Sequence, residues 1–256
     1  MVNQIESFIL GDDEFKDFLK ILNYCSDMCA DLHVVDRKIL QRTDTKTAII
    51  RCDLKNIFQF DGEIIFSNIA NVLKNLKGLD KKSPIRFKRL ENSLIIKDTN
   101  TSIITTLGNE KHCENKIMPE AEFSEIIKLG SMFLECNIDK GLCNSLNGFS
   151  RVNNQHAVML RIRSGNAVFG YGGGGRSIRS EFKVNHKLKK DMFDCYMNLP
   201  AMIFNTKSAF TLRVYCGKKN CQTDSIATCI YNFFINKKMT FEIYSRSTIL
   251  KGQDEE

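Results

Sequence analysis

The sequence predicts an α+β protein built of two similar domains, and three observations support this fold class. Short amphipathic helices recur along the chain, strand-like segments follow each of them, and a polar stretch near the middle interrupts the pattern. Apolar residues recur at i, i+3, i+4 and i+7 within 12–22, and the segment 67–76 repeats that spacing. Each helix is therefore expected to bury one stripe and to turn its opposite, lysine-bearing face outward.

The N-terminal half contains two units in which strands surround a helix. Acidic residues open the first helix, where they favour the helix dipole, and Ser67 is a suitable N-cap for the second. Turn residues separate the strand candidates from one another. These candidates are 5–10, 32–35, 39–42, 47–53, 63–66, 85–90, 93–97 and 102–106.

The polar segment 107–120 breaks the periodicity, contains Gly108 and ends beside Pro119, which is typical of a linker. We therefore expect an N-terminal domain in 1–108, a linker in 109–120 and a C-terminal domain in 121–256. The segment 121–129 is compatible with a helix or with a strand. Beyond it, the pattern predicts helices in 139–152 and 200–205, and strands in 132–138, 158–163, 167–171, 177–184, 192–197, 209–215, 226–234 and 239–244.

The composition indicates which kind of partner and which cellular compartment to expect. A formal net charge of +7 over 256 residues favours a polyanionic partner such as nucleic acid, with surface solubility as the alternative explanation. No apolar run is long enough to span a bilayer, and the acidic, polar start is unlike a signal peptide, so we expect no membrane contact and no secretion. Ten scattered cysteines favour reduced thiols in a cytoplasmic or nuclear compartment.

Four stretches together resemble the DNA sliding clamps, such as proliferating cell nuclear antigen and the phage polymerase clamps. The segment 40–54, LQRTDTKTAIIRCDL, resembles the strand, polar Asp- and Thr-containing turn and apolar strand of those proteins. The segment 66–98 is similar to the second unit of a clamp domain, and 146–173 to the first helix and hairpin of the second domain. The segment 241–256 is similar to the last clamp strand with its acidic tail. The resemblance implies two clamp-type domains of repeated strand-helix-strand units, with the helices lining one face.

The resemblance also implies a function, that of a non-enzymatic processivity factor for a DNA polymerase. Such a clamp would encircle duplex DNA without reading its sequence, tether the polymerase, and need a clamp loader. The two-domain length is typical of clamps that close as homotrimers.

Several alternatives stay open. The basic charge differs from that of the usually acidic cellular clamps, and the Asn-, Lys- and Ile-rich composition is compatible with a phage or virus acting in the host cytoplasm. A viral factor of this fold could bind DNA directly as a monomer. A transcription accessory factor with RNA polymerase as partner is another alternative, and a nucleic-acid-modifying enzyme is a third.

Lysines on the helix faces are the candidate DNA contacts. Lys16 and Lys20 project from the first helix, and Lys74 and Lys77 from the second, each pair at a spacing that shares one face. A solvated helix face would look the same in sequence. The resemblance adds three further cations to the set, namely Lys140, Arg151 and Lys207.

By the same resemblance, a peptide of a partner enzyme would dock beside the linker and the chain end. The matching positions are Thr43, Thr47, Ile117, Met118, Thr248 and Ile249. These apolar residues could instead serve only to pin the linker. The subunits of a clamp pair through edge strands, expected here in 102–106 and 176–184, with Ile103, Ile104, Ile178 and Phe182 at the interface.

Neither catalytic residues nor metal ligands are expected, and no cofactor. The glycine run in 170–176 lacks the Lys-Ser/Thr pair of a phosphate-binding loop, so we expect a hairpin or loop there. The cysteine and histidine spacings do not form the paired set of a zinc site, and the histidines stand beside no recognisable nucleophile motif.

Overall fold

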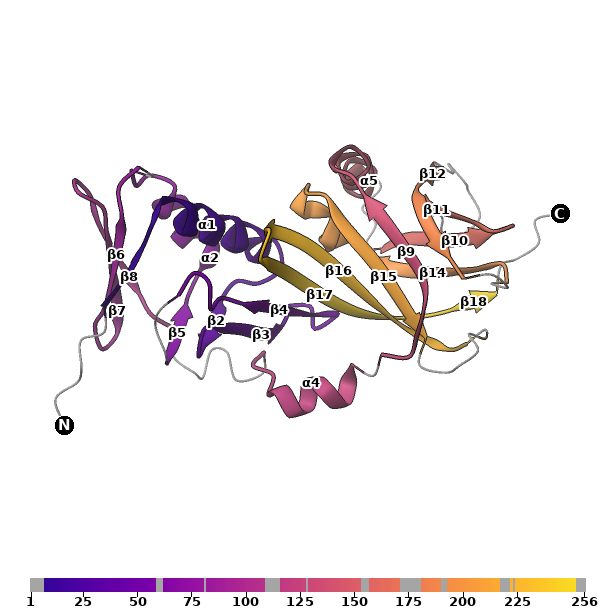
Figure 1. The fold of residues 1–256 in the computed structure, drawn as a ribbon, viewed down its shortest axis with the longest axis horizontal. Helices are drawn as coiled ribbons and strands as arrows, with labels where there is room; N and C mark the ends of the chain where they lie inside the picture. The colour runs from indigo at the N-terminus through magenta and orange to yellow at the C-terminus, as the bar shows by residue number, and fades with distance from the viewer. Residues whose placement is uncertain are drawn as a thin grey trace. The chain divides into compact units, whose positions relative to one another are not determined.

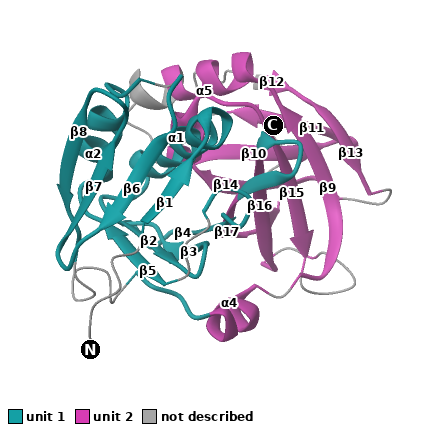
Figure 2. Ribbon diagram, turned by 60° about the vertical axis from the view of Figure 1, so that its left-hand side comes forward, with its two compact units in different colours: residues 1–119, 234–241 teal, residues 120–233, 242–256 magenta. Residues whose placement is uncertain are grey.

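The computed structural model describes residues 7–58, 62–80, 82–108, 116–127, 129–152, 157–170, 181–189, 193–216, 222 and 224–251. The chain forms two compact units that are not two simple halves of the sequence (Figure 2). Unit 1 consists of Met1–Pro119 and Phe234–Phe241, and unit 2 of Glu120–Phe233 and Glu242–Glu256. One hairpin therefore contributes residues to both units.

Unit 1 contains two antiparallel sheets and a pair of helices (Figure 1). One sheet has the order β1-β6-β7-β8, and the other includes β4-β3-β2-β5 in that order. The helices α1 and α2 pack against each other. The element bounds are β1 Ser7–Leu10, α1 Asp12–Ser26, β2 Leu32–Val35, β3 Lys38–Arg42, β4 Ala48–Asp53, β5 Glu63–Phe66, α2 Ile69–Leu76, β6 Ile85–Arg89, β7 Ser93–Lys97 and β8 Ser102–Thr106.

Aromatic side chains hold the core of unit 1 together. Phe8 from β1 stacks on Phe87 from β6 with ring centroids 4.7 Å apart, and Phe58 meets the edges of Phe8 and Phe18 at 5.0 Å. Edge-to-face and offset contacts of this kind add to the gain from burying the rings. The apolar stripe of α1 is thus anchored against a sheet, as its residue spacing predicts.

The hairpin tip Phe234–Phe241 completes unit 1. It comes from the strands β16 (Ile226–Asn236) and β17 (Met239–Thr248), and β17 lies beside β4. Phe241 packs against Tyr24 of α1 at 5.4 Å, and the Cys52 thiol of β4 donates to the carbonyl of Thr240 at 3.5 Å. The hairpin of β16 and β17 therefore stabilises unit 1.

Unit 2 repeats the arrangement of two sheets and a helix pair. Its sheets have the orders β12-β11-β10-β14-β18 and β13-β9-β15-β16-β17, and α5 packs against the short 3-10 helix η1. The remaining bounds are α4 Glu120–Ile126, β9 Ser131–Ile138, α5 Lys140–Val152, β10 Ala157–Arg163, β11 Asn166–Gly170, β12 Glu181–Lys183, β13 Asn185–Leu188, β14 Cys195–Pro200, η1 Ala201–Thr206, β15 Phe210–Cys216 and β18 Leu250–Lys251.

The α+β class and the similarity of the two parts, both predicted from the sequence, are confirmed. The segment whose type the sequence left open is the helix α4, which buries only Phe123. Two strands were missed, β13 and β18, because both are short and polar and show no apolar alternation. The N-cap of α2 is Asn68, not Ser67, because Asn68 adopts the left-handed conformation and its side chain accepts from the N–H of Asn71.

Candidate nucleic-acid interface

Helix α1 presents the first pair of candidate DNA-binding lysines. The helix begins after Gly11, whose N–H donates to the Glu14 carboxylate at 2.8 Å, and Asp12 and Asp13 add negative charge to its first turn. Its apolar stripe is buried, and Lys16 is exposed on the opposite face. The expected division of the helix into a buried and a charged face is therefore present.

Lys16 is already neutralised within its own helix. Its ammonium lies 2.7 Å from Asp12 and 3.6 Å from Asp13. The hydrogen bond to Asp12 raises the pKa of Lys16. A phosphate would have to compete with these two carboxylates for the charge.

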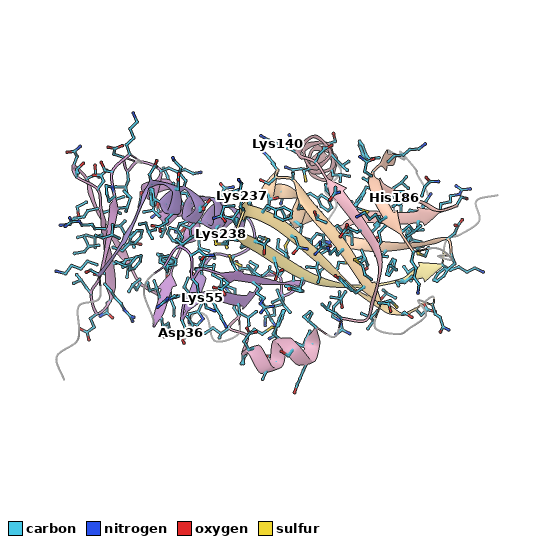
Figure 3. All side chains as sticks on the ribbon, in the orientation of Figure 1. Asp36, Lys55, Lys140, His186, Lys237 and Lys238 are labelled. Atoms are coloured by element: carbon cyan, nitrogen blue, oxygen red, sulfur yellow. The ribbon has the colours of Figure 1, made fainter. Side chains whose placement is uncertain are left out.

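Lys20 binds the backbone of the hairpin tip. Its ammonium donates to the carbonyls of Phe234 at 2.8 Å and Ile235 at 3.0 Å. One turn away, the Asn236 amide donates to Asp17 at 2.5 Å. The side chains of Lys20, Asp17 and Asn236 thus hold the hairpin on α1. The sequence did not reveal this structural role of Lys20. Figure 3 shows Lys237 and Lys238 at the turn of the same hairpin, and both are exposed.

Helix α2 presents Lys74 and Lys77 to solvent. Ile69, Val72 and Leu73 are buried on its other side, and Lys77 forms its C-cap. Within the described ranges, neither lysine forms an ion pair, in contrast to Lys16. A cation at the C-terminal end of a helix is also favoured by the helix dipole.

The helix pair of unit 2 carries two more cations at helix ends. Lys140 is the first residue of α5, and Lys207 caps η1 in the left-handed conformation at φ 51°. Both side chains are exposed. The Cys143 thiol of α5 donates to the Ser208 carbonyl at 3.1 Å, which ties α5 to the segment after η1. Arg151 lies in the last turn of α5, but its side chain is outside the described residues.

Residues 116–118, which the sequence pattern assigned to a linker, are held within unit 1 by backbone and charge contacts. The N–H of Arg42 donates to the carbonyl of Lys116 at 2.8 Å, and Ile117 forms a bridge with Gln41. The Lys116 ammonium lies 2.7 Å from Asp44 and 3.6 Å from Asp31. These three ionic residues carried no recognisable signal in the sequence, because their pairing depends on the fold.

The candidate partner-binding residues of unit 1 differ in exposure. Thr47 is exposed and Ile117 is half-buried, whereas Thr43 and Met118 are buried. The Thr43 hydroxyl lies 3.3 Å from the Ala48 carbonyl, inside the turn. The buried pair holds the turn and the linker in place, so the accessible part of this surface is Thr47 with Ile117.

In unit 2, Thr248 is exposed at the end of β17 and Ile249 is fully buried. The N–H of Ile249 donates to the Ser225 carbonyl at 2.9 Å, and its own carbonyl accepts from Asp224 at 2.7 Å. Ile249 therefore anchors the chain end, and Thr248 is the accessible residue of the two.

The candidate subunit-contact strands are both sheet edges. β8 ends its sheet in unit 1, where Ile104 is 70% exposed and Ile103 is half-buried. β12 ends a sheet of unit 2 and carries the half-buried Phe182. Ile178 and most of the glycine run lie outside the described residues. An edge strand keeps backbone groups free to pair with another strand.

The cysteines that the structure describes are buried and free. Burial raises the pKa of Cys136, Cys143 and Cys229 to about 12, so these thiols stay protonated at neutral pH. Over the described ranges, no three His, Cys, Asp or Glu residues come together as metal ligands. Nor does this part of the chain contain a helix with the length and apolarity needed to cross a membrane.

Comparison with models of protein families and with curated protein sequences gave no match. Among solved structures, the chain is similar to the proliferating cellular nuclear antigen of Entamoeba histolytica, with 11% identity over 94% of this chain and 98% of that one, and a TM-score of 0.65. It is similar to the PCNA2-PCNA3 complex of Sulfolobus tokodaii, with 9% identity, 94% and 99% coverage, and a TM-score of 0.62. A third structure, A. fulgidus PCNA bound to the C-terminal region of FEN-1, gives 11% identity, 99% and 100% coverage, and 0.60.

Proposed function

We propose that this chain, which has the fold of the DNA sliding clamps, is a non-catalytic processivity factor that holds a DNA polymerase on duplex DNA. The observation that carries the proposal is the repeated helix pair. In both units, exposed cations stand on or directly beside the helices, namely Lys74, Lys77, Lys140 and Lys207. A clamp of this kind would bring such cations together around one duplex.

Lysine contacts with phosphate suit a protein that must move along DNA. They carry no sequence information, so no base-specific bond has to be broken at each step. Lys74 and Lys77 are the strongest members of the set because they have no ion pair within the described residues. Lys16 and Lys20 contribute less, since carboxylates or carbonyls already occupy their ammonium groups. Arg151 is kept as a further candidate in α5.

The proposed assembly is a homotrimer closed through β8 of one copy and β12 of the next. Both strands are sheet edges, and the strongly exposed Ile104 on β8 would be covered by such a contact. Ile103, Ile178 and Phe182 are the further interface candidates. The S. tokodaii structure is a complex of two PCNA subunits, which supports oligomerisation as a property of similar proteins.

The proposed polymerase contacts are Thr47 and Ile117 in unit 1 and, as a separate candidate, Thr248 in unit 2. The A. fulgidus structure holds the C-terminal region of FEN-1, which supports docking of a segment of a partner on proteins of this fold. Thr43, Met118 and Ile249 are buried, and each would hold the accessible residues next to it in position. A clamp loader completes the set of proposed partners.

The test is charge reversal on the helices. Lys74→Glu, Lys77→Glu and Lys140→Glu together should reduce association with duplex DNA by about tenfold or more, since each lost phosphate contact weakens nonspecific binding. The matched control is Arg86→Glu, Lys88→Glu and Lys97→Glu, which makes the same change in net charge on a sheet of unit 1. Fluorescence anisotropy with two unrelated duplexes, at several salt concentrations, measures both variants.

The expected pattern is loss in the helix variant, retention in the sheet variant, and no dependence on DNA sequence. An equal loss of DNA binding in both variants would mean that only the overall charge matters. Full retention of DNA binding in the helix variant would mean that these lysines are only a solvated surface. Circular dichroism confirms that each variant is folded.

A further inference from the structure

The outward face of the β1-β6-β7-β8 sheet carries an unusual set of side chains. Residues alternate strictly along these strands, so that one face is buried and the other is open. The residues of the open face that concern us here are Ile9, Arg86, Lys88, Ile95, Lys97 and Ile104, which we call the cationic sheet face. The four strands of this sheet are labelled in Figure 2.

The strand register places like charges together on this face. Arg86 lies directly opposite Lys97, and Lys88 lies two residues along the same strand. Directly opposite residues on one face of an antiparallel pair have Cβ atoms roughly 5 Å apart, and like charges there are destabilising. The fold thus holds three cations in mutual repulsion.

The structure offers these cations no counterion within the described residues. The nearest acid in sequence, Asp98, is engaged elsewhere, since its carboxylate accepts from the N–H groups of Asp80 at 2.7 Å, Asn100 at 2.7 Å and Thr101 at 2.5 Å. These backbone hydrogen bonds also lower the pKa of Asp98. Its negative charge therefore stabilises two turns and is not directed at Lys97.

Isoleucines surround the cations and complete a mixed surface. Ile9 lies opposite Arg86 and is 48% exposed, and Ile95 lies opposite Lys88 on one side and Ile104 on the other. Ile104 is 70% exposed. Exposed aliphatic side chains between unpaired cations suit a ligand that combines carboxylates with apolar groups.

The dimensions of the face favour a short segment over a folded domain. Four neighbouring strands about 4.8 Å apart, each four or five residues long, give a surface of roughly 15 Å by 15 Å. Stable contacts between folded proteins cover about 800 Å² on each partner, which is several times this area. An extended peptide of about five residues would cross it from one side to the other.

We propose that the cationic sheet face binds an extended acidic peptide of a partner protein, in which carboxylate and aliphatic side chains are interleaved. The carboxylates pair with Arg86, Lys88 and Lys97, and the aliphatic side chains cover the isoleucines. A nucleic acid fits less well, because none of the residues of the face is aromatic and the isoleucines offer no base-stacking surface. This site is independent of the helix lysines. It shares Ile104 with the proposed β8 contact between copies, so in the assembly the face consists of the three cations with Ile9 and Ile95.

The probe is a fluorescent heptapeptide with aspartate and valine in turn at its odd positions and serine at its even positions, so that both kinds of side chain point to the same side of the extended peptide. Its counterpart carries asparagine in place of each aspartate. The chain should bind the acidic peptide about tenfold more tightly than the counterpart, and added salt should weaken that binding. Arg86→Ser, Lys88→Ser and Lys97→Ser together should abolish the preference. The control Lys74→Ser, Lys77→Ser and Lys140→Ser removes the same charge and should keep it. Ile9→Ser tests the apolar part and should weaken binding about threefold.

Three outcomes would overturn the proposal. The first is equal binding of the two peptides. The second is an equal loss of the preference for the acidic peptide in the sheet variant and in the control. The third is binding of an oligonucleotide, single- or double-stranded, that is lost in the sheet variant alone, which would assign the face to nucleic acid. Because the substituted cations repel one another and are exposed, the sheet variant should remain folded, and thermal melting verifies this.

Discussion

Lys16 and Lys20 lie one turn apart on α1, yet their ammonium groups have different surroundings. Lys16 meets two carboxylates of its own helix, whereas Lys20 donates to two carbonyls more than two hundred residues away in sequence. The first contact is local and exposed, and pairs of that kind contribute little to stability. The second contact joins α1 to the hairpin that completes unit 1.

This difference leads to an expectation for stability. Lys20→Met should lower the free energy of unfolding by about 1 kcal/mol, because two carbonyls lose a charged donor. Lys16→Met, the matched control, should leave the free energy of unfolding nearly unchanged, because its ion pairs are exposed to solvent. Urea unfolding followed by circular dichroism compares the two. An equal effect of both substitutions would show that the Lys20 contacts are not used for stability in solution.

At the scale of elements, the repulsion between β6 and β7 gives a second expectation. Lys97→Glu replaces the like-charged neighbour of Arg86 by an opposite charge, which should raise stability by about 0.2–1 kcal/mol. The control is Lys55→Glu, at an exposed site outside this sheet, where a lysine beside Asp53 is lost and no gain is expected. Thermal melting at low and high salt measures the effect. A gain that persists unchanged at high salt would not be electrostatic.

Local patterns predicted the elements that have a local cause. The helices α1 and α2 were predicted because their apolar residues repeat at helical spacing, and most strands because they alternate or follow turn residues. α4 was ambiguous since it buries a single side chain, Phe123. β13 was missed because its pairing with β9, and not its own composition, makes it a strand.

The candidate site was predictable only in part, for the same reason. The helix spacing identified which lysines share a face, but not that Lys20 is bound to the hairpin or that Lys116 pairs with Asp44. Those contacts join segments far apart in the chain. The cationic sheet face was missed as well, because only strand register brings Arg86 and Lys97 together.

At the scale of the whole molecule, the proposed clamp requires assembly through β8 and β12. Multi-angle light scattering after gel filtration should give about three times the mass of one chain. Ile104→Lys should shift the mass toward that of one chain, because it adds a charge to the exposed centre of β8, whereas Ile9→Lys on β1 should not. A single-chain mass for the unaltered protein at high concentration would favour a factor that binds DNA without closing a ring.

The shared hairpin sets the order in which the polypeptide can mature during translation. Unit 1 needs Phe234–Phe241, so its last strand leaves the ribosome only after Glu120–Phe233 of unit 2 has been synthesised. Until then β4 lacks its neighbour β17, and Lys20 lacks the carbonyls that it binds in the finished protein. The N-terminal part of unit 1 therefore lacks this hairpin while unit 2 is synthesised. A nascent chain halted before residue 234 should be cut by protease in unit 1, and release of the hairpin should confer resistance.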